Sequence, residues 1–120
     1  MITFHDPDGL RIAEVTNPGF VISSVQDAVD LLGELSFDNC SSVILREINF
    51  HPDFFKLQTG LAGDILQKFS NYSFRLTIIG DFSKFKSKSL QDFIRESNKG
   101  NAVYFTDNID NALGRLFPGK

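Results

Sequence analysis

Short apolar runs alternate along the chain with longer stretches in which apolar residues recur at helical spacing. The apolar runs within Val43–Ile48 and Phe74–Gly80 each predict a β-strand, and their continuity indicates that both strand faces are covered. The amphipathic stretch between them, Phe54–Phe69, predicts a helix. Two short strands joined by a helix of this length are typical of a parallel crossover unit.

Two glycines leave two interpretations of this helix. Gly60 and Gly63 interrupt its middle, and a glycine in a helix interior costs roughly 1 kcal/mol relative to alanine. The stretch is therefore either one helix or a short turn followed by a longer helix that starts near Thr59. In the second interpretation, the Thr59 hydroxyl accepts a hydrogen bond from a first-turn amide as the N-cap.

The same alternation continues toward the N-terminus. Ile2–Phe4 and Leu10–Val15 alternate apolar and polar residues on either side of the turn-forming segment His5–Gly9, which predicts a hairpin. A helix is expected from about Val25 to Leu35, with Ser24 as its N-cap. The hairpin requires some antiparallel pairing in the sheet.

Toward the C-terminus the pattern repeats once more. Ser87 or Ser89 caps a helix that stops at Asn98–Gly100, Ala102–Phe105 forms a strand, and Thr106–Asp107 caps a last helix. The resulting order is β-β-α-β-α-β-α-β-α. It indicates a single α/β domain over residues 1–120, with a mixed and mainly parallel sheet.

Composition narrows the class of protein. Of the 120 residues, 42% are hydrophobic, which excludes a disordered chain and allows one domain with its own core. A net charge of −3 argues against nucleic acid as a partner, and no apolar run approaches the length of a membrane span. The single cysteine, Cys40, excludes an intrachain disulfide and suits a reducing compartment. We therefore expect a cytoplasmic protein, with much phenylalanine surface to bury because it has 13 Phe and no Trp.

Several runs of residues resemble one bacterial family. They are Phe54–Gly63, Leu66–Tyr72, Gly80–Ser83, Ser87–Leu90 with Asp92–Ile94, and Glu96–Asn98. In these runs, which are spread over most of the chain, the sequence is similar to members of domain-of-unknown-function family 4180. The resemblance implies a bacterial protein and implies no activity.

A more distant resemblance is to STAS domains, the SpoIIAA-like anti-sigma factor antagonists and their relatives. It rests on the order of elements and on Leu57–Leu61, which is similar to the Asp-Ser-Ser/Thr-Gly-Leu turn that opens a helix in those domains. The last three residues match, whereas Leu57 replaces the Asp and Gln58 replaces the serine that is phosphorylated there. The resemblance implies a STAS/SpoIIAA-like fold without carrying over the phosphorylation site.

Thr59 is nevertheless a candidate for a phosphorylation switch. A phosphate at a helix N-terminus is favoured by the free amides and by the helix dipole. The alternative is a plain N-cap beside a glycine needed for packing.

Polar side chains also gather at the end of the first central strand. They are Arg46, Glu47, Asn49, His51 and Asp53, with Asp81 at the end of the neighbouring strand. Ligands gather at the carboxyl ends of strands in open α/β sheets, so histidine and carboxylates here can form an acid–base pair or a metal site. The alternative is an ordinary helix start, in which Asp53 interacts favourably with the dipole.

The loop after the second central strand is basic and aromatic. Lys84 and Lys86 lie close in sequence to Phe82 and Phe85. Such a loop binds phosphate groups, bases or a protein when its rings point outward. With the rings tucked inward it is only a solvated loop.

Our first functional hypothesis is a non-enzymatic regulatory module that binds a protein partner, with neither cofactor nor metal, and with a homodimer as a further expected assembly. The expected surface joins the helix start Gln58–Gly63 to the loop Asp81–Ser89. Its candidate residues are Gln58, Thr59, Gly60, Asp81, Phe82, Lys84, Phe85 and Lys86.

Two alternatives remain open. One is a STAS-like domain that binds a small ligand or a lipid, and the other, less favoured, is an enzyme that uses His51, Asp53 and Asp81. Convergence of these three side chains would favour the enzyme. A closed apolar cavity would favour the ligand-binding domain, and a flat, partly apolar surface would favour the protein-binding module.

Overall fold

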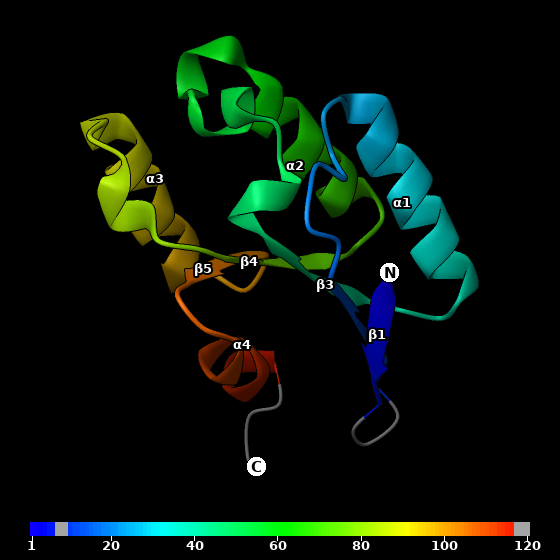
Figure 1. Cartoon of the computed structure of the whole chain (residues 1–120). Helices are drawn as coiled ribbons and strands as arrows, with labels where there is room; N and C mark the ends of the chain where they lie inside the picture. Colours follow the sequence, from blue (N-terminus) through cyan, green and yellow to red (C-terminus); the bar gives the residue numbers. More distant parts are fainter. Residues whose placement is uncertain (7–9, 117–120) are drawn as a thin grey trace.

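Five strands form one mixed sheet in the computed structural model, which describes residues 1–6 and 10–116 (Figure 1). The strands are β1 (Ile2–His5), β2 (Ile12–Val15), β3 (Ser42–Arg46), β4 (Arg75–Ile79) and β5 (Val103–Thr106), and they lie side by side in sequence order. The first pair is antiparallel, as the predicted hairpin requires, and the other three pairs are parallel. The predicted turn falls largely on residues 7–9, which lie outside the described residues.

Four α-helices belong to the described part of the chain, and they cover the sheet unequally (Figure 1). They are α1 (Val25–Phe37), α2 (Leu61–Asn71), α3 (Lys88–Lys99) and α4 (Ile109–Leu116). Right-handed crossovers that always step in the same direction place their helices on the same face, as seen for α1, α2 and α3. Since α4 follows the last strand and crosses to no further one, it is free to cover the opposite face.

Strand alternation explains the apolar run in β3. Val43 and Leu45 belong to the main core under the three helices, whereas Ile44 belongs to a smaller core with Ala112 and Leu116 of α4. Successive side chains of a strand point to opposite faces, so a strand covered on both sides is apolar throughout. Within residues 1–6 and 10–116, no helix is both long and apolar enough to cross a membrane.

The segment Phe54–Phe69 is not one helix. Two short 3₁₀ turns, Pro52–Phe55 and Leu57–Thr59, precede α2, so the interpretation of a turn followed by a helix is the correct one. Gly60 joins them with a φ of 80°, a left-handed conformation that favours glycine. Gly60 therefore occupies the N-cap position predicted for Thr59, although the Thr59 hydroxyl still accepts a hydrogen bond from the Leu61 N–H at 3.2 Å.

The other predicted helix starts are correct in two of three cases. The hydroxyls of Ser24 and Ser87 accept hydrogen bonds from amides in the first turns of α1 and α3. The last helix starts later than Thr106–Asp107, because the Asn108 side chain accepts the Asn111 N–H at 2.7 Å. Thr106 instead completes β5.

Candidate functional site

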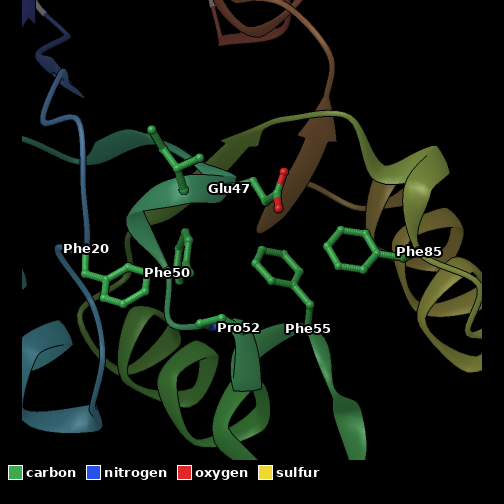
Figure 2. Close-up of a pocket in the computed structure, with 7 residues that line it drawn as sticks. Phe20, Glu47, Phe50, Pro52, Phe55 and Phe85 are labelled. Carbon is green, nitrogen blue, oxygen red and sulfur yellow. The ribbon is translucent and has the colours of Figure 1, made fainter.

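A hollow of about 200 Å³ lies at the edge of the sheet where β2, β3 and β4 end (Figure 2). Its lining residues all follow one of these strands in sequence, and all but one are apolar. They are Phe20, Glu47, Ile48, Phe50, Pro52, Phe55 and Phe85. In open α/β sheets this is the edge where ligands bind.

Buried phenylalanines form the floor of the hollow. The ring centroids of Phe50 and Phe54 are 4.3 Å apart, and the Phe55 ring stacks on Phe85 at 5.1 Å. Pro52 begins the 3₁₀ turn that carries Phe54 and Phe55 back over the end of the sheet. Since Phe50 and Phe55 are buried, the floor is a packed and preformed surface.

Exposed apolar side chains form part of the rim. Phe20 is 62% exposed and Ile48 is 51% exposed. The Phe20 ring lies against His51, with ring centroids 5.8 Å apart. Single exposed apolar residues are common, but two of them beside an apolar hollow make a continuous patch that indicates a contact site.

Glu47 is the charged residue of the lining. Its Oε2 atom lies 2.6 Å from Lys84 Nζ, so an ion pair joins the turn after β3 to the turn after β4. Gly80, at the end of β4, makes room for this side chain, because a Cβ atom there would lie 2.7 Å from the Glu47 Cβ atom. A larger residue at position 80 would therefore displace Glu47.

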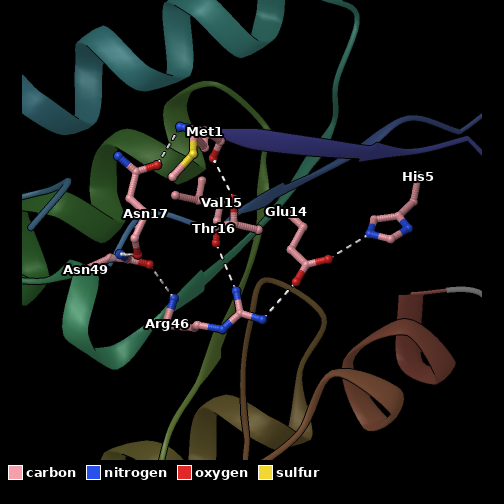
Figure 3. Close-up of polar contacts among 8 residues, drawn as sticks. All are labelled: Met1, His5, Glu14, Val15, Thr16, Asn17, Arg46 and Asn49. Atoms are coloured by element: carbon pink, nitrogen blue, oxygen red, sulfur yellow. Dashed lines mark hydrogen bonds and ion pairs between the residues drawn. The ribbon is translucent and has the colours of Figure 1, made fainter. Parts of the chain in front are cut away.

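Two members of the predicted strand-end cluster have structural contacts instead (Figure 3). Asn49 is buried, accepts the Arg46 backbone N–H, and donates to the carbonyl groups of Asn17 and Gly19. These bonds hold the segment that leads to Phe20. Asn49 thus positions the rim of the hollow from behind.

Arg46 does not line the hollow and belongs instead to an ion network with Glu14 and His5 (Figure 3). Its guanidinium lies 2.8 Å from Glu14 Oε2, and His5 Nε2 lies 2.9 Å from Glu14 Oε1. Burial alone would raise the pKa of Glu14, but the hydrogen bonds from Arg46 and His5 lower that pKa below its ordinary value. The network joins β1, β2 and β3.

The three side chains proposed for an enzyme make local contacts. His51 Nδ1 accepts the Asp53 N–H at 3.1 Å, and the Asp53 carboxylate lies 3.9 Å from the same nitrogen. Asp81 accepts both the N–H and the hydroxyl of Ser83, and these bonds lower the pKa of Asp81. Each of these contacts belongs to a turn, and among the described residues no three His, Cys, Asp or Glu side chains are placed to hold a metal ion.

The comparison with protein families gives one match. A family model described as "Domain of unknown function (DUF4180)" matches residues 7–116. The chain belongs to the DUF4180 family. No curated protein and no solved structure matches the chain.

In this DUF4180 chain, the predicted loop Asp81–Ser89 has its rings turned inward. Phe82 and Phe85 are half-buried, and Phe82 packs edge-on against Phe105 at 5.2 Å. Lys84 pairs with Glu47, whereas Lys86 is exposed and forms no ion pair within the described ranges. The basic side chains, rather than the rings, are therefore the outward feature of this loop.

Thr59 is exposed, as are Gln58 and Gly60. The Thr59 hydroxyl lies 2.8 Å from the Asp53 carbonyl and 2.9 Å from the Lys56 carbonyl, so it ties the two 3₁₀ turns together. Phosphorylation of Thr59 stays a prediction.

Sequence reasoning missed most of the hollow of the DUF4180 domain. Phe20, Ile48, Phe50, Pro52 and Phe55 were not singled out as site residues, although the high phenylalanine content and the turn residues around Pro52 were visible. The sequence does not show this proximity, because Phe20 lies about thirty positions before the other lining residues and is held near them by the hydrogen bond from Asn49 to the Gly19 carbonyl.

Cys40 is not part of the hollow. It is a buried free thiol whose pKa is raised by burial.

Proposed function

We propose that this DUF4180 protein is a non-enzymatic regulatory module that binds a segment of a partner protein in the hollow. The observation that carries this proposal is the pair of exposed rim residues, Phe20 and Ile48, over a floor of buried phenylalanine rings. Covering the rim would remove apolar surface from water at about 25 cal/mol per Å².

The size of the hollow supports a single side chain as its occupant. Its volume of about 200 Å³ is below the ~300–1,000 Å³ of sites that bury whole small molecules. One leucine- or phenylalanine-sized anchor from an extended segment would fit such a space.

The charges beside the hollow support an acidic residue next to that anchor. Lys84 forms an ion pair with Glu47, whereas Lys86, which follows Phe85 in the same loop, is exposed. An acidic side chain of the partner would therefore meet an uncompensated cation, which favours orientation and association rate. The proposed ligand is an extended segment with an apolar anchor flanked by Asp or Glu.

We also propose a fold relationship and a cellular location for this protein. The order of elements and the Thr59–Leu61 turn support a STAS/SpoIIAA-like relationship. The free thiol of Cys40 supports a cytoplasmic location, and a bacterial origin is proposed from the family resemblance alone. The proposed surface extends from the hollow across Asp81–Ser89 to Gln58–Gly63. Exposure of Thr59 supports its use as a switch at the margin of this surface.

A small apolar ligand is the second candidate function. The aromatic floor of the hollow, with stacked Phe55 and Phe85, favours this alternative. A ligand retained on the purified protein, detected by native mass spectrometry and lost when Phe20 and Ile48 are both changed to Ser, would support it over the protein segment. The local contacts of His51, Asp53 and Asp81 favour no catalytic role.

The test is selection of displayed peptides on the purified chain, followed by affinity measurement by fluorescence anisotropy. We expect peptides with an apolar anchor and an adjacent acid. Changing Phe20 and Ile48 to Ser should weaken binding by at least about tenfold, which corresponds to about 1.4 kcal/mol.

Two further variants complete this test. Phe37→Ser removes a phenylalanine that is 87% exposed at the end of α1, outside the lining of the hollow, and should leave binding unchanged. Lys86→Glu should shift the preference away from acidic peptides. Equal weakening by the Phe37 variant, or no selected peptides at all, would contradict the proposal.

A further inference from the structure

The two outer edges of the sheet differ in how their backbone groups are satisfied. At the β5 edge, the Asn98 side chain donates to the Phe105 carbonyl at 3.0 Å and accepts the Phe105 N–H at 2.8 Å. A side chain of α3 thus takes the place that another strand would occupy. Because these bonds occupy the outward backbone groups of Phe105, this part of the edge is protected against pairing with a further strand.

The β1 edge has no such cover among residues 1–6 and 10–116. Thr16 N–H donates to the Met1 carbonyl at 3.0 Å, which fixes where the bonded pairs of β1 and β2 fall. Because bonded and non-bonded pairs alternate in an antiparallel ladder, Thr3 and His5 also bond to β2. The N–H and carbonyl groups of Ile2 and Phe4 therefore point outward.

We propose that the protein forms a homodimer in which β1 pairs antiparallel with β1 of a second copy, centred on Thr3. This register places Ile2 opposite Phe4 of the second copy, and Phe4 opposite Ile2. All outward backbone groups of both residues are then paired, and one sheet continues through both copies. Such an interface is isologous, because the same strand serves on both sides of a two-fold axis.

In this register, the β1 side chains of the two copies are compatible across the two-fold axis. Ile2 and Phe4 both pack toward the main core, so apolar side chains face apolar side chains across the axis. Thr3 meets Thr3 of the second copy, a favourable cross-strand pair. A register centred on Phe4 would place Ile2 opposite Asp6, and one centred on Ile2 would leave the Phe4 groups unpaired.

A second hollow lies beside this edge and enlarges the contact. It has a volume of about 180 Å³ and is lined by Met1, Ile2, Val15, Asn17, Val21, Leu31 and Glu34. Phe4 of the second copy, opposite Ile2 and on the same side of the sheet, would lie next to it. This matters because pairing of two four-residue strands buries too little surface by itself for a stable interface.

The decisive experiment uses charge at the two-fold axis. Thr3 is exposed and lies opposite Glu14 on β2. Thr3→Glu and Thr3→Lys leave the apolar core of the monomer intact, and each brings like charges face to face at the two-fold axis. Because Thr3→Glu also adds a carboxylate beside Glu14 whereas Thr3→Lys adds an opposite charge there, loss of the dimer in both variants is the expected result. Analytical ultracentrifugation over a dilution series should find a dimer for the unchanged chain and a monomer for each variant. An equimolar mixture of the two variants should recover the dimer.

A control variant tests whether added charge alone dissociates the dimer. Asn111→Glu makes the same charge change at an exposed position on α4 and should remain dimeric. A monomeric unchanged chain at every concentration would overturn the proposal. Dimeric Thr3 variants, or a mixture that stays monomeric, would overturn it as well.

A cross-link keeps the proposal testable if either charged variant fails to fold. The two Thr3 residues would form a non-bonded pair with Cα atoms about 4.5 Å apart, within the ~4.4–6.8 Å that a disulfide spans. Thr3→Cys should become a covalent dimer on mild oxidation, while Asn111→Cys should not. Cys40 is buried and adds little background. Equal cross-linking of both variants, or none of Thr3→Cys, would refute the register.

Discussion

The two faces of the sheet differ in how much of their surface is covered by helices. Three helices cover one face with a continuous apolar core that includes the phenylalanine cluster (Figure 1). On the other face, the described residues place a single helix, α4, which has eight residues and packs on Ile12, Ile44 and Ile79. Beyond the reach of α4, the strands carry the His5–Glu14–Arg46 network instead of apolar side chains. Paired charges thus join the strands on the part of this face that lies outside the α4 core.

The largest effect is expected on the three-helix face. Phe54→Ala removes a ring that is 1% exposed and packed between Phe50 and Phe55. It should lower the free energy of unfolding by about 3–5 kcal/mol. Urea denaturation measures this value, with Phe37→Ala at an exposed site expected to stay within about 0.5 kcal/mol. Similar losses for both variants would contradict the packed aromatic cluster.

A smaller effect is expected on the α4 face. Arg46→Met keeps much of the side-chain volume but leaves Glu14, only 12% exposed, without its guanidinium. The expected loss is about 1–3 kcal/mol at neutral pH, because a largely buried carboxylate then keeps only His5 as a side-chain partner.

A matched control separates this burial effect from charge in general. Arg95→Met breaks the exposed Arg95–Asp92 pair on α3, whose atoms are 2.6 Å apart, and should cost under about 1 kcal/mol. If the Arg46 variant were no less stable than the Arg95 variant in the same denaturation series, the network would not stabilise this face.

The pH dependence of stability should separate the faces further. The pKa of Glu14 in the folded protein lies below its ordinary value. The stabilisation from this carboxylate is therefore complete above the pKa of the unfolded chain and is lost as pH falls through the folded pKa. At neutral pH, the free energy of unfolding of the unchanged chain should be about 1–2 kcal/mol higher than that of Glu14→Gln. That difference should shrink in acid, as measured by denaturation at successive pH values. A difference independent of pH would assign the effect to packing.

Much of this comparison could be predicted from alternation alone. The apolar run Val43–Leu45 correctly indicated a strand covered on both sides. The same alternation implies that Arg46 lies on the face of Ile44, away from Val43 and Leu45, although its partner Glu14 is far away in sequence. The members of the predicted strand-end cluster take different directions at the turn after β3: Arg46 pairs with Glu14, whereas Glu47 pairs with Lys84.

The hollow could not be predicted in the same way. Its residues come from the segments that follow three strands, and whether they meet depends on the turns in those segments. A periodic pattern fixes the face of a residue within an element but gives no position to a residue such as Phe20 in a connecting segment. The Asn49 side chain, which fixes that segment by two hydrogen bonds, looks in sequence like any turn asparagine.

The smallest effect on stability is expected from a polar contact on the three-helix side. Thr59→Glu replaces an exposed hydroxyl that joins two 3₁₀ turns, and the added charge near the start of α2 compensates in part for the lost bonds. Unfolding free energy should change by no more than about 0.5 kcal/mol. Thr59→Val, which lacks both hydroxyl and charge, is the control. If Thr59→Glu leaves both stability and binding of the selected peptide unchanged, Thr59 is not a switch. A change in affinity that is absent from Thr59→Val would assign the effect to the charge at position 59.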